Sequence, residues 1–296
     1  MTNKMNLQLF AAATNTTVAA DLEPAISVDF TSRISQNIDE LRRVLGISEL
    51  VPMSAGTDIK IYKISKKNSP AQVGEGENIN LTEIERKLVR TITLDLNKYR
   101  KNTTAEAIQK VGRSIAINQT DEKLIAEIQK DIKKAFYTAL ATGTGTATGA
   151  TLQVTLANLW AKLQSYYEDM DVTPIFFVNP QDVADYLGTA QITMQTAFGF
   201  TYIENFLGLG TVVVTPQVAA KTVYATAQEN LNGAYAPVSG DVGQTFGLTA
   251  DATGLLGMTH QMKSENATID TLIMSNVIFY PEYADGVFKG TIQGES

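Results

Sequence analysis

The longest helical pattern in the chain covers residues 103–141, and it limits what the rest can fold into. In its second half apolar residues recur at every fourth position, with Lys and Glu between them: Leu124, Ile128, Ile132 and Phe136. A continuous helix over this range would be about 58 Å long at 1.5 Å per residue, well beyond the width of a small domain. Thr120 could interrupt it as a new N-cap, because two acidic residues follow. We therefore expect an α+β protein with a long axial helix.

The stretch ALATGTGTATGATL, residues 139–152, follows this helical pattern directly. Phosphate-binding loops of the Walker and dinucleotide types follow a strand, and the Walker type also needs a lysine, which is missing here. No nucleotide cofactor is therefore expected. Glycines permit positive φ and sharp changes of chain direction, and threonines can bond freed helix carbonyls. We interpret Gly143, Gly145 and Gly149 as a hinge between two domains.

A long hairpin is predicted before the helix. The segments 57–65 and 88–96 alternate apolar and polar residues, and the polar stretch between them contains Pro70, Gly74 and Gly76. A two-stranded ribbon is marginally stable in water, so this hairpin needs another surface to lie against.

Charge is unevenly distributed along the chain. Residues 57–102 carry 10 basic and 6 acidic residues, whereas residues 142–296 carry 4 basic and 14 acidic residues. This uneven charge can be ordinary solubilising charge. Alternatively, it can dock the basic hairpin of one subunit onto the acidic part of another. The hairpin cations that we expect at such a contact are Lys60, Lys63, Lys66, Lys67, Arg86 and Lys87.

The remaining pattern predicts an extended arm, a short helix and a mixed α/β unit. Residues 1–30 lack periodicity and are poor as a signal peptide, so we interpret them as an arm. No apolar run approaches the length of a membrane span. The other expected elements are a helix from Thr31 or Ser32 to Leu45, helices at 155–169 and 181–187, strands at 174–180, 211–216 and 222–226, and one long strand at 268–283.

No residue pattern indicates an enzyme, a metal site or a cofactor site. The chain has no cysteine and one histidine, His260, which has no acid–nucleophile pattern around it and is expected to be structural. Glu168, Asp169 and Asp171 lack the spacing of a calcium loop and are expected to be a solvated helix end. Trp160 lies on the apolar side of its helical pattern and is predicted to be in the core.

Three stretches, in this order, resemble the major capsid proteins of tailed bacteriophages with the Hong Kong phage-type fold. The start MNLQLFA is similar to head proteins of phages of Gram-positive hosts. KLIAEIQKDIKKAFYTALATGTGTATGATL is similar to the spine helix and its exit loop, and ENATIDTLIMSNVIFYPEYADGVFKGTI to the last strand of the P-domain.

The resemblance implies a division of the chain into six parts. These are an N-terminal arm at 1–30, a first P-domain helix and connection at 31–56, an E-loop hairpin at 57–102, a spine helix at 103–142, an A-domain at 143–245, and a return to the P-domain at 246–296.

The resemblance also implies a function. Subunits would form hexamers and pentamers and then an icosahedral-type shell around double-stranded DNA, which is contacted non-specifically. The shell would be the virion capsid, assembled in the host cytoplasm with a portal protein and without a membrane. We expect no scaffolding domain before the arm, so assembly would use a separate scaffolding protein or none, and no covalent crosslink is expected. An encapsulin-like compartment and a secreted surface or adhesion protein are the alternatives.

Overall fold

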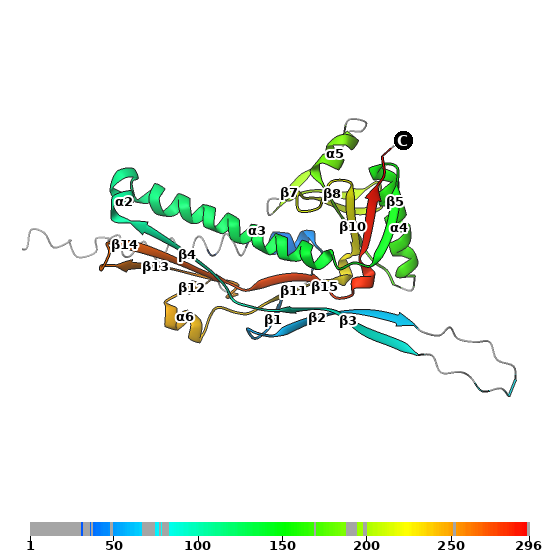
Figure 1. Ribbon diagram of the computed structural model, residues 1–296, viewed down its shortest axis with the longest axis horizontal. Coiled ribbons are helices and arrows are strands. Elements are labelled where there is room, and N and C mark those ends of the chain that lie inside the picture. The colour runs from blue at the N-terminus through cyan, green and yellow to red at the C-terminus, as the bar shows by residue number, and fades with distance from the viewer. Residues whose placement is uncertain are drawn as a thin grey trace, which may run out of the picture.

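The computed structural model describes residues 38–47, 50–66, 83–168, 170–187, 194–197, 200–250 and 253–294, and positions 31, 36, 75, 76 and 78. The molecule is elongated (Figure 1). At one end a long helix lies along a sheet, at the other end a second sheet is flanked by helices, and a two-stranded hairpin runs below that second end (Figure 1). The expected α+β fold with an axial helix is confirmed.

The axial helix, α3 (Thr120–Leu140), buries the predicted apolar positions Ile128, Ile132 and Phe136. The rest of the expected helical range is broken. Before α3, the chain forms strand β4 (Asn97–Thr104), helix α2 (Ala105–Val111) and a π-helical segment (Ser114–Gln119).

Thr120 does not cap a new helix, so that prediction is wrong. Its hydroxyl donates to the carbonyl oxygens of Ala116 and Ile117 at 2.8 and 2.9 Å, one turn back along the chain. The π-helical turn therefore passes into α3 without a fresh N-terminus. The break in the helical range lies earlier, at Gly112, where φ is 84°.

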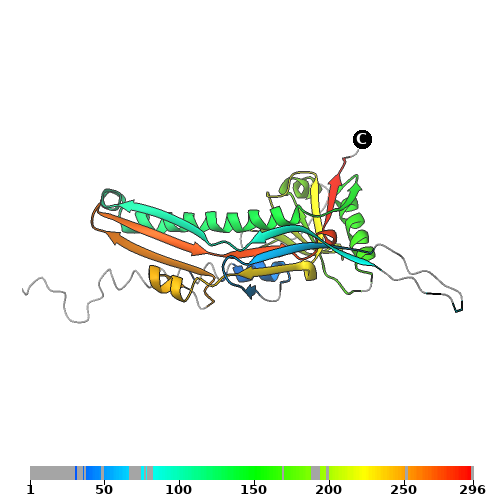
Figure 2. The ribbon, with the colours of Figure 1, turned by 60° about the horizontal axis from the view of Figure 1, so that its bottom comes forward.

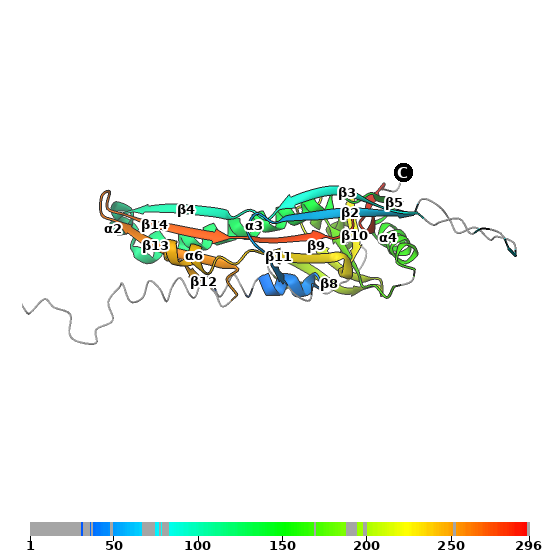
Figure 3. The same ribbon diagram turned by 90° about the horizontal axis from the view of Figure 1, so that it is seen from below.

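A four-stranded antiparallel sheet lies along α3, with its strands side by side in Figure 3. Its order is β12 (Thr249–Ala250), β13 (Leu256–Lys263), β14 (Thr268–Ser275) and β4. Figure 2 shows α3 covering one face of this sheet. Residues 97–102, which the sequence grouped with the hairpin, belong to this sheet because β4 pairs with β14 over its whole length.

The hairpin consists of β2 (Asp58–Lys66) and β3 (Ile84–Thr93), and both predicted strands are confirmed. The register shifts between Ile61 and Tyr62, which pair with Arg90 and Leu88. Val89 is therefore the extra residue of a β-bulge, and Leu88 and Arg90 face opposite sides of the ribbon.

The second end of the molecule is a seven-stranded sheet, which confirms the predicted mixed α/β unit. Its order is β5 (Gly145–Gly149), β16 (Phe288–Ile292), β10 (Thr222–Ala227), β6 (Pro174–Val178), β9 (Gly210–Val214), β8 (Phe200–Phe206) and β7 (Gln195–Ala197). Helix α4 (Leu152–Tyr166) packs on one face, and helix α5 (Pro180–Leu187) follows β6.

The central strand β6 links the two ends of the molecule through its alternating side chains. Phe176 packs in the cluster formed with α4, whereas Phe177 faces the axial helix. The ring centroids of Phe136 and Tyr137 lie 5.5 and 5.6 Å from that of Phe177. The end of α3 and the seven-stranded sheet therefore share one hydrophobic core.

The predicted strand at 268–283 is two strands, β14 and β15 (Val277–Pro281), in different sheets. β15 joins β1 (Leu50–Pro52) and β11 (Leu231–Tyr235) in a three-stranded sheet. The break lies at buried Asn276, whose side chain donates to the carbonyl oxygen of Leu94 at 3.3 Å. β16 (Phe288–Ile292) then enters the seven-stranded sheet, whereas the resemblance assigned residues 246–296 to the P-domain.

The expected N-terminal helix is present at residues 38–44. It ends at Gly46, where φ is 73°, and the amide of Ile47 bonds back to the carbonyl oxygen of Arg42 at 3.0 Å. The arm at 1–30 lies outside the described residues.

Candidate assembly surfaces

The base of the hairpin is fixed to the body of the molecule. Ile61 is fully buried and packs with Ala139 and Ala284. The guanidinium of Arg90 donates to the carbonyl oxygen of Thr138 at 2.8 Å, and the amide of Tyr62 donates to that of Glu282 at 3.2 Å. These contacts set the direction in which the hairpin projects.

Beyond its base the hairpin exposes apolar and basic side chains together. Ile84 is 67% exposed and Leu88 is 46% exposed. Arg86 lies between them in sequence, and its guanidinium carbon is 3.6 Å from the centroid of the Tyr62 ring. Large apolar side chains at such exposure, beside an ordered cation, are typical of a protein–protein contact.

The predicted contact residues fall into two groups. Lys60, Arg86 and Lys87 are exposed and Lys63 is partly buried, so they are placed as a contact would require. The side chain of Lys66 and all of Lys67 lie outside the described part of the structure. Sequence reasoning missed Ile84 and Leu88, although the pattern Ile84, Arg86, Leu88 alternates and would have extended the predicted strand.

The glycine-rich stretch is a strand, not a loop. Residues 145–149 form β5, which pairs in parallel with β16. None of Gly143, Gly145 and Gly149 has a positive φ, so the conformational reason given for these glycines is wrong.

Close packing explains the same three glycines. A Cβ on Gly143 would lie 2.7 Å from the carbonyl oxygen of Val287, one on Gly145 would lie 2.1 Å from Cδ1 of Phe288, and one on Gly149 would lie 2.5 Å from the amide nitrogen of Thr155. The expected threonine role is confirmed at Thr142, whose hydroxyl donates to the carbonyl oxygen of Ala139 at 2.7 Å. The hinge stays a prediction, and any motion there has to disturb these contacts.

His260 is a structural histidine, as expected. Its Nε2 lies 2.8 Å from Oδ2 of Asp121, which is fully buried. Lys101 pairs with the other carboxylate oxygen and also donates to the carbonyl oxygen of Ile117 at 3.1 Å. The cluster joins β13 and β4 to the start of α3. Sequence reasoning did not find Asp121 as the partner of His260, because the two residues are 139 positions apart.

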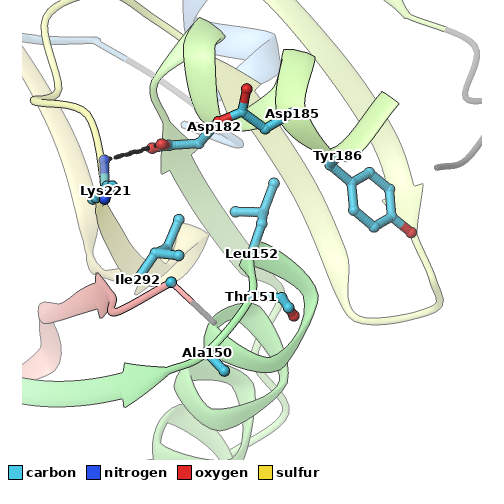
Figure 4. A pocket seen from close by; sticks show the side chains of 9 residues that line it. Ala150, Thr151, Leu152, Asp182, Asp185, Tyr186, Lys221 and Ile292 are labelled. Carbon is cyan, nitrogen blue, oxygen red and sulfur yellow. Dashed lines mark hydrogen bonds between the residues drawn. The ribbon is translucent and has the colours of Figure 1, made fainter. Parts of the chain in front are cut away.

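A cavity of about 460 Å³ lies between the start of α4, α5 and the end of β16 (Figure 4). Its two carboxylates are Asp182 and Asp185. Both oxygens of Asp182 accept the amide of Lys221, at 3.0 and 2.9 Å, and hold that residue at a φ of 60°. Burial raises the pKa of Asp182, but the group already serves the backbone. We therefore interpret Asp182 in this cavity as structural support for the strained turn at Lys221.

Within the described ranges, no three His, Asp or Glu side chains come together as metal ligands. Glu168 and Asp171 are exposed at the end of α4, as expected, and Asp169 lies outside the described residues. Trp160 is 37% exposed, so its predicted place in the core is wrong. The buried side of α4 is centred on Leu156, Leu159 and Leu163, and Trp160 lies at the edge of that stripe.

No helix in the described part of the chain has the length and hydropathy of a membrane span. Comparison of the sequence with protein families gives no match, and neither does comparison with curated protein sequences.

Comparison with solved structures gives the decisive observation. The chain is similar to the SrpI encapsulin of Synechococcus elongatus PCC 7942, with a TM-score of 0.54, 12% identity and coverage of 98% of this chain and 96% of that chain. The capsid of an empty GTA particle matches with a TM-score of 0.53, 11% identity and coverage of 85% and 89%.

The chain has the Hong Kong phage-type capsid fold. A structure from Mycobacterium phage Patience also matches, with a TM-score of 0.50, 11% identity and coverage of 96% of this chain and 95% of that chain.

Proposed function

We propose that this chain is the major capsid protein of a tailed phage, in line with the sequence resemblance to head proteins of phages that infect Gram-positive hosts. It forms hexamers and pentamers that close into an icosahedral-type shell around double-stranded DNA. The capsid fold supports this proposal. The observation that carries it is the exposure of Ile84 and Leu88 on a two-stranded hairpin that is fixed to the body through its base. A neighbouring subunit would bury them.

The charge distribution supports assembly through many modest contacts. The 57–102 segment has an excess of four positive charges, and residues 142–296 have an excess of ten negative charges. Opposite charges on separate parts of one subunit favour association between subunits, and repeated weak contacts give a stable shell. The further partners in this proposal are a portal protein and a separate scaffolding protein, with shell assembly in the host cytoplasm.

Negative-stain electron microscopy of the purified full chain tests the proposal. Closed shells of uniform size are expected. A chain that stays monomeric at high concentration, across a range of salt concentrations and with its scaffolding protein supplied, would overturn it.

An encapsulin-like compartment is the second candidate, because a holo-encapsulin complex is among the similar structures. The contents of particles from the natural source separate the two. Nuclease-protected DNA supports the phage capsid, and a co-purified enzyme inside the shell supports the compartment.

A further inference from the structure

We infer that the β-bulge at Val89 and the side chain of Arg90 set the angle at which the hairpin leaves the body of its own subunit. Both are positioning residues, because this angle decides which shell the subunit can build. We call the hairpin up to the pair of Ile61 with Arg90 the fixed half, and the part from Tyr62 and Leu88 onward the free half. The inference rests on the proposed shell function and names what controls the hairpin within it.

The bulge lies at the point where the hairpin leaves the body. Ile61 in the fixed half is fully buried, whereas Leu88 and Ile84 in the free half are 46% and 67% exposed. Val89, the extra residue of β3, lies between the two halves. A bulge bends its strand and increases the local twist. The bend therefore occurs where a small change of angle moves the whole free half.

The bulge contributes a bend and nothing else to the hairpin. Without Val89 the ladder would keep its pairs on both sides, with Arg90 opposite Ile61 and Leu88 opposite Tyr62. The side chains would also face the same sides of the ribbon, because β2 passes the bulge without an extra residue. Val89 therefore changes the direction of the ribbon while it leaves the cross-strand pairs unchanged.

Arg90 holds this angle against the end of α3. The helix ends at Leu140, so the carbonyl oxygens of its last four residues have no partner inside the helix. The amides of the three residues that follow bond three of these oxygens. The guanidinium of Arg90 supplies a donor to the fourth, on Thr138, at 2.8 Å. The negative end of the helix dipole favours a cation at this place.

The contacts of the fixed half end beside the bulge on both strands. Ile61, opposite Arg90, packs with Ala139 and Ala284. The next amide along β2, that of Tyr62, donates to the carbonyl oxygen of Glu282 at 3.2 Å. The free half therefore turns about this point, and the bend at the bulge and the Arg90 contact determine its direction.

Distances between two spin labels in unassembled subunits test the angle, because the natural sequence has no cysteine that would also be labelled. One label is attached at Ile84→Cys. The other is attached at Ala126→Cys on α3 or, in a second pair, at Gln164→Cys on α4, and all three positions are exposed. Two reference points detect a swing that one of them would miss.

Deletion of Val89 should shift the mean distance in at least one label pair. Ile84 lies about 16 Å along the strand from the bulge, at about 3.3 Å per residue. Loss of a bend of about 25°, the ordinary twist between strands, would move this label by about 7 Å. Val89→Ala keeps the extra residue and is the matched control, so its distances should equal those of the natural chain.

Arg90→Ala should broaden the distance distribution about twofold, because the free half loses its bond to the helix end. Arg90→Lys keeps a charged donor and should restore most of the natural width. The urea midpoint should stay close to that of the natural chain in both variants, because the contact is exposed. A role in stability alone would move the midpoint and leave the distances unchanged.

Shell formation connects the angle to assembly. Deletion of Val89 should lower the yield of shells of natural diameter about tenfold, because a changed rotation between subunits no longer closes the same ring. Val89→Ala should give the natural yield. Negative-stain electron microscopy measures both the yield and the diameter.

Unchanged distances after deletion of Val89 would overturn the inference, whatever the shells do. If the deletion variant does not fold, equal widths for Arg90→Ala and the natural chain would overturn it instead. A shifted distance with normal shells would refute the link between the angle and assembly. Absence of shells for the natural chain would overturn the proposed function, and the distances would still decide whether the bulge sets the angle.

Discussion

Nε2 of His260, on β13, lies 2.8 Å from Oδ2 of Asp121, the second residue of α3. Lys101 on β4 holds the other oxygen of the same carboxylate. Asp121 is fully buried, and the side chain of His260 is 6% exposed. One carboxylate thus fixes two strands of the four-stranded sheet to α3 at the point where the π-helical turn ends.

Asp121→Asn should lower the free energy of unfolding by roughly 3 kcal/mol, because it leaves the mostly buried Lys101 without its counter-charge. Urea unfolding followed by circular dichroism measures this. The control is Glu127→Gln, which breaks an exposed pair with Lys130 at 3.4 Å and should cost less than about 0.5 kcal/mol. Equal losses of unfolding free energy for the two substitutions would show that the buried cluster stabilises the fold no more than an exposed ion pair does.

Asp270 lies on the face of the four-stranded sheet opposite to His260. Its carboxyl should make the stability of the protein fall in acid. Lys263 above all, then Asn102 and Arg100, hold the pKa of its carboxyl at about 2, below its ordinary 3.8. Because the folded-state pKa is lowered, the stabilisation is complete above the ordinary value and is lost as pH falls toward about 2. Urea midpoints between pH 4 and pH 2 should therefore fall less steeply for Asp270→Asn than for the natural chain. Parallel curves would contradict the assignment.

The packed glycines should differ in their tolerance of alanine. Gly149→Ala brings Cβ to 2.5 Å from the amide nitrogen of Thr155, a backbone atom inside α4, whereas Gly145→Ala meets the ring of Phe288. A ring can rotate and a helix backbone cannot, so we expect a loss of about 2–3 kcal/mol for Gly149→Ala and a smaller loss for Gly145→Ala. Thermal unfolding compares the two. Phe288→Leu should restore most of the stability lost in Gly145→Ala. If Gly145 were needed instead for backbone flexibility, as in a hinge, Phe288→Leu would not restore the stability.

Replacement of residues 66–84 by an Asn-Gly turn should leave a folded subunit that forms no stable closed shells. The base contacts of Ile61 and Arg90 remain, while Ile84 and the hairpin tip are removed. Circular dichroism should change little, and sedimentation should show free capsomers or monomers. Normal shells from this variant would show that the hairpin is dispensable.

The sequence predicted those elements whose pattern is local. The hairpin strands, β6, β10 and the stripe of α3 each follow from periodicity within a few residues. The break between β14 and β15 was missed because both strands are apolar and buried, and only Asn276 marks the passage between sheets.

Features set by distant contacts were beyond a single sequence. The role of Gly145 depends on Phe288, and the place of His260 depends on Asp121, so neither has a local signal. Glycine is compatible with both a turn and a crowded strand, and the structure assigns it to the crowded strand. Of the assembly surfaces, the basic hairpin was predicted, and its exposed Ile84 and Leu88 were not.

The position of β16 has a consequence for biosynthesis. This strand lies between β5 and β10, which the ribosome makes more than sixty residues earlier. Until residue 292 has been synthesised, β5 lacks the strand that pairs with it in the described part of this sheet, and such distant pairing slows folding. The seven-stranded sheet is therefore completed only after β16 has left the ribosome.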